Sequence, residues 1–314
     1  MKILITGSNG FLGQYLCRHL SKLDYSVLAH TRTPQKNTSP KIKNINFDLN
    51  DNLEASNLNE IDVIVHCAGR AHVMNETANS PLDAYRKTNV QGTLNLAKKA
   101  VQSGVRRFIY LSSIKVNGEE ASQIRPFTLD DKVNTGDPYG LSKYEAEQEL
   151  LKLASKTGLE VVIIRPVLIY GPNVKANFKS MIELSAKKIP LPIGCLDNKR
   201  SMVSVYNLAD FIHTCMTHPN ASGEVFLVSD QDDISVKQLF EKLAYHQNNK
   251  LVMLPIPKAL IGFLASLVGR KAVASRLCSE LVVDTSKNIQ LLGWHAPYSV
   301  DESLQKMFNT TTLK

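Results

Sequence analysis

The sequence is poor in the features that mark secreted, membrane-spanning and metal-binding proteins. Its 314 residues include five cysteines, none of them at the spacing of a disulfide framework or a metal site: Cys17, Cys67, Cys195, Cys215 and Cys278. Scattered thiols are typical of proteins kept reduced, so we expect a cytoplasmic location and no metal. No basic leader with a cleavage site precedes the first strand-like run, which argues against a secretory signal.

Long hydrophobic runs are also lacking. The most apolar stretch, residues 251–269, is interrupted by Pro255, Pro257 and Lys258, which leaves about eleven continuous apolar or helical residues. A helix needs about 20 residues to span a bilayer. We therefore expect no membrane span and a helix packed in a second domain, with weak interfacial attachment as the alternative.

Acidic residues are fewer than basic ones, and the net charge is +8 with a pI of about 9.1. The basic residues are dispersed, and no basic run is interleaved with aromatic residues. Nucleic acid is therefore not an expected partner. An anionic small substrate, or solubility, explains the charge.

What is present begins at the N-terminus. An apolar run at residues 3–5 leads into three glycines spaced three apart, Gly7, Gly10 and Gly13, and leucines then recur at helical spacing (Leu12, Leu16 and Leu20). Glycines let a strand turn sharply into a helix and let the backbone approach a diphosphate closely. The helix N-terminus adds free N–H groups, so the sequence predicts a dinucleotide site here.

Strand-like runs alternate with helical patterns in the first half of the chain. The strands are expected at residues 2–5, 26–29, 61–66, 107–111 and 160–164, with helices over 83–103 and 139–153. This alternation predicts an α/β fold: a Rossmann-type doubly wound parallel sheet with a smaller C-terminal α/β substrate domain. We expect a dinucleotide-binding domain over 1–165 and a mainly substrate-binding domain over 166–314, with partial return to the first.

Three polar side chains form the strongest candidate for chemistry. Ser113 follows a predicted strand, and Tyr139 and Lys143 are four residues apart, on one face of a predicted helix. A free tyrosine has a pKa of about 10, which a nearby ammonium and a nicotinamide cation would lower. We expect Tyr139 to exchange the proton, while the Ser113 hydroxyl holds the substrate oxygen.

Several motifs together resemble the extended short-chain dehydrogenases/reductases, the NAD-dependent epimerase/dehydratase family. They are residues 6–13 (TGSNGFLG), Ser112-Ser113, residues 137–143 (DPYGLSK) and Arg165-Pro166, with further matches at 89–93, 284–287 and 292–294. The resemblance covers essentially the whole chain. Runs at 66–74 and 110–118 resemble the bacterial nucleotide-sugar 4-reductases and 4-epimerases of surface-polysaccharide synthesis, the UDP-N-acetylquinovosamine type.

The resemblance implies roles for residues at matching positions. It implies a catalytic set of Ser113, Tyr139 and Lys143. It implies cofactor contacts from Gly7, Gly10, Phe11, Leu12, Gly13, Arg32, Asp48, Leu49, Ala68, Gly69, Asn89, Tyr139, Lys143 and Pro166. It implies substrate contacts from Ser113, Asn177, Arg200 and Arg276. A homodimer through the helices over 83–103 and 139–153 is also implied.

The second predicted strand bears on the choice of cofactor. An acidic residue at its end would bind the ribose 2′-hydroxyl of NAD, whereas an arginine accommodates the 2′-phosphate of NADP. The chain has Arg32 there and no acidic residue until Asp48. We therefore expect NADP(H), with NAD(H) as the alternative.

Three functional hypotheses follow. The first is NADPH-dependent reduction of the 4-keto group of a UDP-4-keto-6-deoxy-N-acetylhexosamine, forming UDP-N-acetylquinovosamine or its 4-epimer for O-antigen or polysaccharide synthesis. The alternative is an NAD-dependent UDP-hexose or UDP-N-acetylhexosamine 4-epimerase. A non-catalytic dinucleotide sensor is disfavoured because Tyr139 and Lys143 are both present. A 4,6-dehydratase is disfavoured because Ile114 and Lys115 stand where that group has Asp-Glu.

Overall fold

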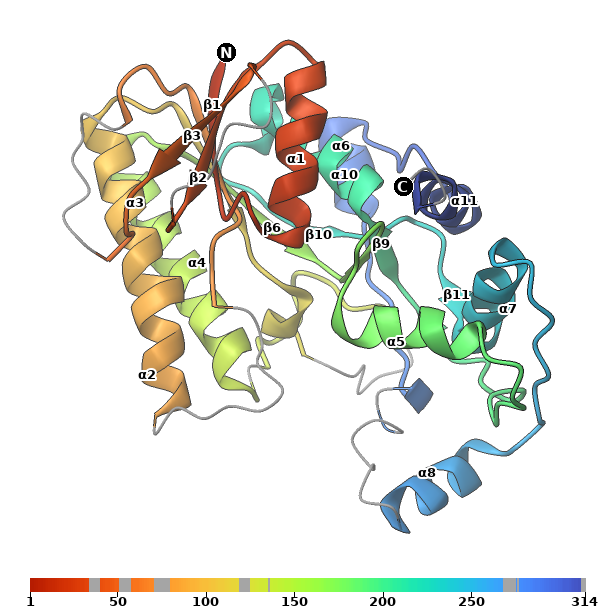
Figure 1. Ribbon diagram of the computed structural model, residues 1–314. Coiled ribbons are helices and arrows are strands. Elements are labelled where there is room, and N and C mark those ends of the chain that lie inside the picture. The colour runs from red at the N-terminus through yellow and green to blue at the C-terminus, as the bar shows by residue number, and fades with distance from the viewer. Residues whose placement is uncertain are drawn as a thin grey trace.

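The computed structural model describes residues 1–33, 40–50, 58–70, 80–118, 125–134, 136–267, 275 and 277–311. Its centre is a seven-stranded sheet (Figure 1) in the order β10-β6-β5-β4-β1-β2-β3. The strands are β1 (Lys2–Thr6), β2 (Ser26–Thr31), β3 (Ile42–Asn46), β4 (Val63–His66), β5 (Arg107–Leu111), β6 (Glu160–Pro166) and β10 (Val225–Val228). All six strand pairs are parallel, which confirms the predicted Rossmann-type sheet.

Five of these strands lie where the sequence predicts them, and two were not predicted. β3 is an edge strand with only partly buried residues, so its apolar pattern is weak. β10 comes from beyond residue 165 and pairs with β6, with Val228 opposite Pro166. The second half of the chain thus contributes one strand to the sheet, and the domain boundary at 165 stays a prediction.

Helices cover both faces of the sheet (Figure 1). Ile3 and Ile5 of β1 point to the face that packs against α1 (Phe11–Lys22) and α6 (Val205–Thr217). Leu4, between them, points to the face covered by α3 (Gly92–Gln102) and α4 (Pro138–Thr157). Successive side chains on a strand point to opposite faces, so an uninterrupted apolar strand is buried on both sides.

The helix predicted over 83–103 has three parts. It starts as α2 (Pro81–Tyr85), widens into a π-helix, η2 (Arg86–Gln91), and continues as α3. A π-helical turn inside an α-helix is often found at a functional site. Here it contains Asn89, which is buried.

Most of the remaining elements form a smaller lobe at the lower right and right of Figure 1, and the others pack against α4, α6 and β10. Two strand pairs, β7 with β9 and β8 with β11, accompany these helices. The bounds are η3 (Ile114–Val116), β7 (Leu168–Tyr170), α5 (Ala176–Ser185), β8 (Lys199–Arg200), β9 (Met202–Ser204), η4 (Pro219–Ala221), β11 (Ile234–Ser235), α7 (Val236–His246), α8 (Lys258–Leu267), α10 (Ser286–Leu292) and α11 (Val300–Thr311).

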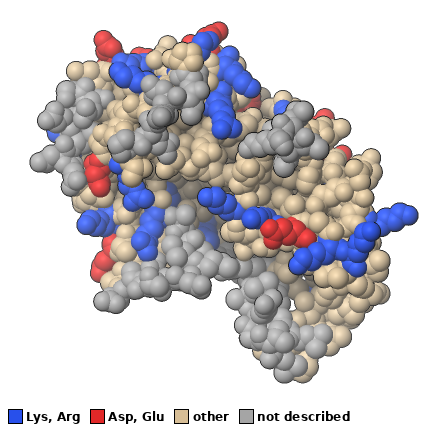
Figure 2. Space-filling view, viewed as in Figure 1, with Lys and Arg blue, Asp and Glu red and all other residues tan. Residues whose placement is uncertain are grey.

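The apolar stretch after residue 250 forms α8, and among the described residues no helix is long and apolar enough to cross a membrane. Ile261 packs against an apolar cluster of the small lobe. Leu260 and Phe263 are instead 44% and 60% exposed, so this part of the helix surface is not covered. On the molecular face in Figure 2, the described Lys and Arg side chains lie in separate groups.

Candidate active site

The glycine-rich turn connects β1 to α1 at the carboxyl edge of the sheet. Gly7 has a φ of +66°, which a residue with a Cβ rarely adopts. The Gly10 N–H donates to the Gly7 carbonyl at 2.9 Å, and a Cβ on Gly13 would lie 2.2 Å from that same oxygen. The turn therefore requires glycine at positions 7 and 13. It also brings the N-terminus of α1, with Phe11 and Leu12, to this edge.

This turn fits the diphosphate of a dinucleotide. No side chain caps the N-terminus of α1 in the described structure, and the capping residue itself is Gly10. The first N–H groups of a helix lack partners within it and attract anions. The backbone of residues 7–13 thus has both the close approach and the donors that a bound diphosphate needs.

The adenosine side of the expected site lies at the ends of β2 and β3. Arg32 is exposed just after β2, and Asp48 is exposed just after β3, where its Oδ1 accepts the Asn50 N–H at 2.8 Å. Leu49 is buried. The ring of His30, in β2, stacks on that of Phe47, just after β3, with 3.8 Å between the ring centroids, a contact that no sequence pattern indicated.

The end of β4 lies next to the turn. The Ala68 N–H donates to Thr6 Oγ1 at 3.2 Å, which ties β4 to the last residue of β1. A Cβ on Gly69 would lie 3.1 Å from Asn89 Oδ1 and 3.5 Å from Lys143 Nζ. The structure thus brings the adjacent residues Ala68 and Gly69 together with Asn89 and Lys143, which come from two other parts of the sequence.

Asn89 is fixed by three hydrogen bonds. Its Oδ1 accepts the Arg70 N–H at 2.8 Å, and its Nδ2 donates to the Arg70 carbonyl at 3.2 Å and to Ser142 Oγ at 3.0 Å. The side chain therefore joins the loop after β4 to α4, one residue from Lys143. Its expected role in cofactor binding agrees with this place but is not tested by it.

Ser113, Tyr139 and Lys143 come together at the carboxyl end of β5. Asp137 caps α4 by accepting the N–H groups of Tyr139 at 2.8 Å and Gly140 at 3.0 Å. A hydrogen bond joins the side chains of Tyr139 and Ser113. Lys143 is buried, and its Nζ donates to the Leu111 carbonyl at 2.7 Å.

The pKa values of the two titratable groups differ from the expectation drawn from sequence. Burial raises the pKa of Tyr139 to about 12, although its hydrogen bond with Ser113 opposes that rise. Burial lowers the pKa of Lys143 to about 8. The protein alone therefore does not lower the pKa of Tyr139, because the loss of hydration outweighs the hydrogen bond with Ser113. The lowering that we expected requires a further positive charge next to the phenol.

Two of the expected substrate contacts, Asn177 and Arg200, lie in the small lobe. Asn177 is exposed in the first turn of α5. Arg200, in β8, donates from Nη1 to the Ser279 carbonyl at 3.0 Å and to Ser279 Oγ at 3.3 Å. Arg276 lies outside the described residues. Pro166 is buried at the end of β6.

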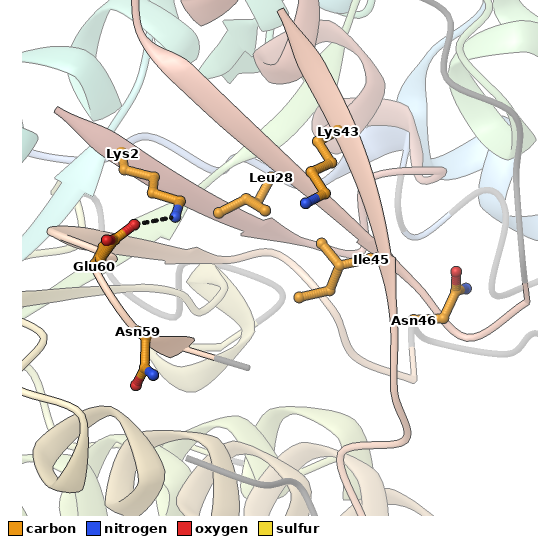
Figure 3. A pocket seen from close by; sticks show the side chains of 7 residues that line it. All are labelled: Lys2, Leu28, Lys43, Ile45, Asn46, Asn59 and Glu60. Carbon is orange, nitrogen blue, oxygen red and sulfur yellow. Dashed lines mark hydrogen bonds and ion pairs between the residues drawn. The ribbon is translucent and has the colours of Figure 1, made fainter. Parts of the chain in front are cut away.

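A separate cavity of about 480 Å³ lies on the β1–β3 side of the sheet (Figure 3). One wall has the Lys2–Glu60 ion pair at 3.0 Å. Lys2 begins β1, whereas the glycine-rich turn follows the end of that strand. The lining includes no residue of the expected site: Lys2, Leu28, Lys43, Ile45, Asn46, Asn59 and Glu60. We therefore do not place the chemistry in it.

The fold and the geometry define a dinucleotide-binding α/β protein with a Ser–Tyr–Lys site. The model of the NAD dependent epimerase/dehydratase family matches residues 3–229. The chain is 43% identical over 309 residues to a UDP-glucose 4-epimerase of Vibrio cholerae, covering 97% of this chain and 93% of that protein. The chain therefore belongs to the NAD dependent epimerase/dehydratase family.

Two further comparisons agree with that membership. The N-acetyl-α-D-glucosaminyl-diphospho-ditrans,octacis-undecaprenol 4-epimerase of Escherichia coli O157:H7 is 28% identical over 321 residues, 97% of this chain and 93% of that protein. The crystal structure of the Thermotoga maritima UDP-glucose 4-epimerase with UDP-glucose has a TM-score of 0.77 at 23% identity, with both chains fully covered. The latter shows the same fold.

Proposed function

We propose that this protein is a 4-epimerase of UDP-hexoses or UDP-N-acetylhexosamines that uses bound NAD. The observation that carries the proposal is the hydrogen-bonded pair of Ser113 and Tyr139 beside the glycine-rich turn, with Lys143 buried next to it. Relatives support the choice of reaction, since two of them are named as 4-epimerases. This reverses the order of the two hypotheses drawn from the sequence.

In the proposed reaction, Tyr139 exchanges the proton of the sugar 4-hydroxyl. The Ser113 hydroxyl, which already contacts Tyr139, holds the same sugar oxygen at hydrogen-bond distance of the phenol. The Lys143 ammonium favours the ionised phenol by its charge. NAD, when bound to the turn at Gly7–Gly13 and to the end of β4, supplies the reversible removal of hydride from the sugar carbon.

The reductase remains the second candidate, and Arg32 favours it. The β2 end has this exposed arginine and no acidic residue, which suits a 2′-phosphate better than a 2′-hydroxyl. A reductase would take a fresh hydride from NADPH in every turnover. The homodimer implied by the resemblance stays a prediction under both candidates.

One assay separates the two candidates. We expect the purified protein to interconvert UDP-GlcNAc and UDP-GalNAc, or UDP-glucose and UDP-galactose, without consuming an added nicotinamide cofactor. The products are resolved by anion-exchange chromatography. Stoichiometric oxidation of NADPH with UDP-4-keto-6-deoxy-GlcNAc, and no interconversion of either UDP-sugar pair, would establish the reductase instead.

Arg32→Ala tests the basis for cofactor choice. A hydrogen bond to a charged group contributes roughly 1.5–3 kcal/mol, which is about 10- to 150-fold in affinity. We expect the variant to bind NADPH more weakly by that factor and NADH equally well, because NADH has no 2′-phosphate. Fluorescence titration with both cofactors measures this. Equal weakening of the two would show that Arg32 contacts the adenosine and not the phosphate.

A further inference from the structure

A buried carboxylate, Glu147, lies on the face of α4 that carries Tyr139 and Lys143, each four residues from the next. The proposed reaction does not use it. Its exposed fraction is 0%, so water cannot stabilise its charge. A buried charge of this kind needs partners, and it has two.

The partners of Glu147 come from two neighbouring strands. Arg165 of β6 donates from Nε to Oε1 at 2.9 Å and from Nη2 to Oε2 at 2.5 Å, a bidentate pair. Ser112, directly after β5, donates its hydroxyl to Oε1. Arg165 also donates from Nη1 to Asn117 Oδ1 at 3.0 Å. These contacts tie α4 to both ends of the segment that carries Ser113.

Glu147 also acts on Lys143 through charge. Around that ammonium lie the groups of Cys67, Tyr110, His66 and Glu147. Burial is the main effect and lowers the pKa of Lys143, while negative charge at Cys67 or Glu147 would raise it. Burial raises the pKa of the Cys67 thiol, lowers that of His66 and raises that of Tyr110, so these three stay neutral at neutral pH.

Arg165 sets the sign of the effect of removing Glu147. In the wild type the positive charge of Arg165 is compensated by the carboxylate of Glu147, with which it forms an ion pair. Without that carboxylate, a cation remains on the neighbouring strand and opposes the charge of Lys143. Loss of Glu147 therefore lowers the pKa of Lys143 in two ways: a negative charge is removed, and the positive charge of Arg165 is no longer compensated.

We propose that Glu147 is a positioning residue: held by Arg165 and Ser112, it fixes the backbone that carries Ser113 and keeps the Lys143 ammonium charged beside Tyr139. The inference rests on the proposed acid–base site. It adds to that site the residue that holds Ser113 in position and Lys143 in its charged form.

A matched control lies at the other end of the same two strands. Arg107, which begins β5, donates from Nε to Glu160 Oε2 at 2.7 Å, and Glu160 begins β6. The Arg107 side chain is buried like that of Arg165, but this pair is at the amino edge of the sheet, away from Tyr139. E160Q thus weakens a different Arg–Glu pair, between β5 and β6, at the opposite end of β6 from Arg165 and without touching the site.

The first measurement is the pH profile of the 4-epimerase reaction. We expect E147Q to lower kcat about 10-fold or more through loss of geometry, with KM nearly unchanged. Its alkaline limb of kcat/KM should move to lower pH by about one unit. We expect E160Q to lower the thermal midpoint and to keep the wild-type profile. A folded E147Q with the wild-type kcat and profile would overturn the proposal.

The second measurement needs no substrate. The ¹³Cε resonance of Lys143, assigned by its loss in K143M, is titrated by NMR in protein labelled with ¹³C-lysine. We expect its midpoint to fall in E147Q and to stay unchanged in E160Q. An unchanged midpoint in E147Q contradicts the charge effect. A shifted midpoint in a protein without 4-epimerase activity would refute the proposed function and leave the inference on Glu147 standing.

Ser112→Ala is a milder variant, because it keeps the Glu147–Arg165 pair. It tests the positioning role of Glu147 even if E147Q does not fold. It removes only the hydroxyl that joins the carboxylate to the residue before Ser113. We expect kcat to fall about 10-fold, with the Lys143 midpoint unchanged. A kcat equal to that of the wild type would contradict the positioning of Ser113 by Glu147.

Discussion

Tyr139→Phe is expected to lower turnover at least about 100-fold, because it removes only the hydroxyl that exchanges the proton in the proposed reaction. The ring stays, so its edge contact with Tyr85 at 5.9 Å and the packing of α4 are kept. Cofactor affinity and the thermal midpoint should therefore barely change. Initial rates with the natural UDP-sugar measure the effect.

Tyr144→Phe is the matched control, since it removes a hydroxyl from the same helix without touching Ser113. We expect nearly normal turnover from it. If Tyr139→Phe also turned over at nearly the normal rate, another group would have to be the acid–base residue. The site would then need to be placed elsewhere.

Lys143→Met is expected to lower turnover about 100- to 1,000-fold, the range for losing one positioned electrostatic group. The side chain is replaced by an apolar one of similar length in a buried position. Two effects on stability oppose each other. The Leu111 carbonyl loses its donor, which costs about 1–3 kcal/mol, but folding no longer buries an ammonium. We expect a thermal midpoint close to that of the wild type.

The stability of the wild type relative to K143M should depend on pH in a direction that the pKa of Lys143 determines. The pKa of Lys143 is about 8 in the folded chain and has an ordinary value of 10.5. Between those pH values the unfolded chain binds the extra proton, so the free energy of unfolding rises with pH. The wild type should therefore gain stability relative to K143M from about pH 8 to about pH 10.5. Urea unfolding at pH 7.5 and 10 measures it, and parallel changes in both proteins would contradict it.

Much of the fold was predictable because its signals are local. An apolar run followed by Gly7, Gly10 and Gly13 predicts a strand, a turn and a helix from neighbouring residues alone. The spacing of Tyr139 and Lys143 places both on one face of α4 whatever else the chain does. β3 was missed because its half-buried edge residues give a weak apolar pattern. β10 was missed because its short apolar run lies beyond residue 165, in the part of the chain assigned to the second domain.

The candidate site was less predictable on its substrate side. The resemblance implied a substrate contact from Arg200, which stays a prediction; what the sequence did not indicate is that its guanidinium donates to Ser279. The network of Glu147 with Arg165 was also missed. One signal could have found it, since Glu147 stands four residues after Lys143 on the same helical face. That spacing places the Glu147 carboxylate near the site, but it does not predict that Arg165 is its partner.

The sequence by itself determined the parallel α/β sheet, the glycine-rich turn and the helix that presents Tyr139 and Lys143, because periodicity and backbone freedom act within a few residues. Only the tertiary structure decided which groups meet: Ser113 with Tyr139, Asn89 with the loop after β4, and Arg165 with Glu147. It also decided their charges. Burial lowers the pKa of Lys143 to about 8 and raises that of Tyr139 to about 12, and burial depends on every element packed around them.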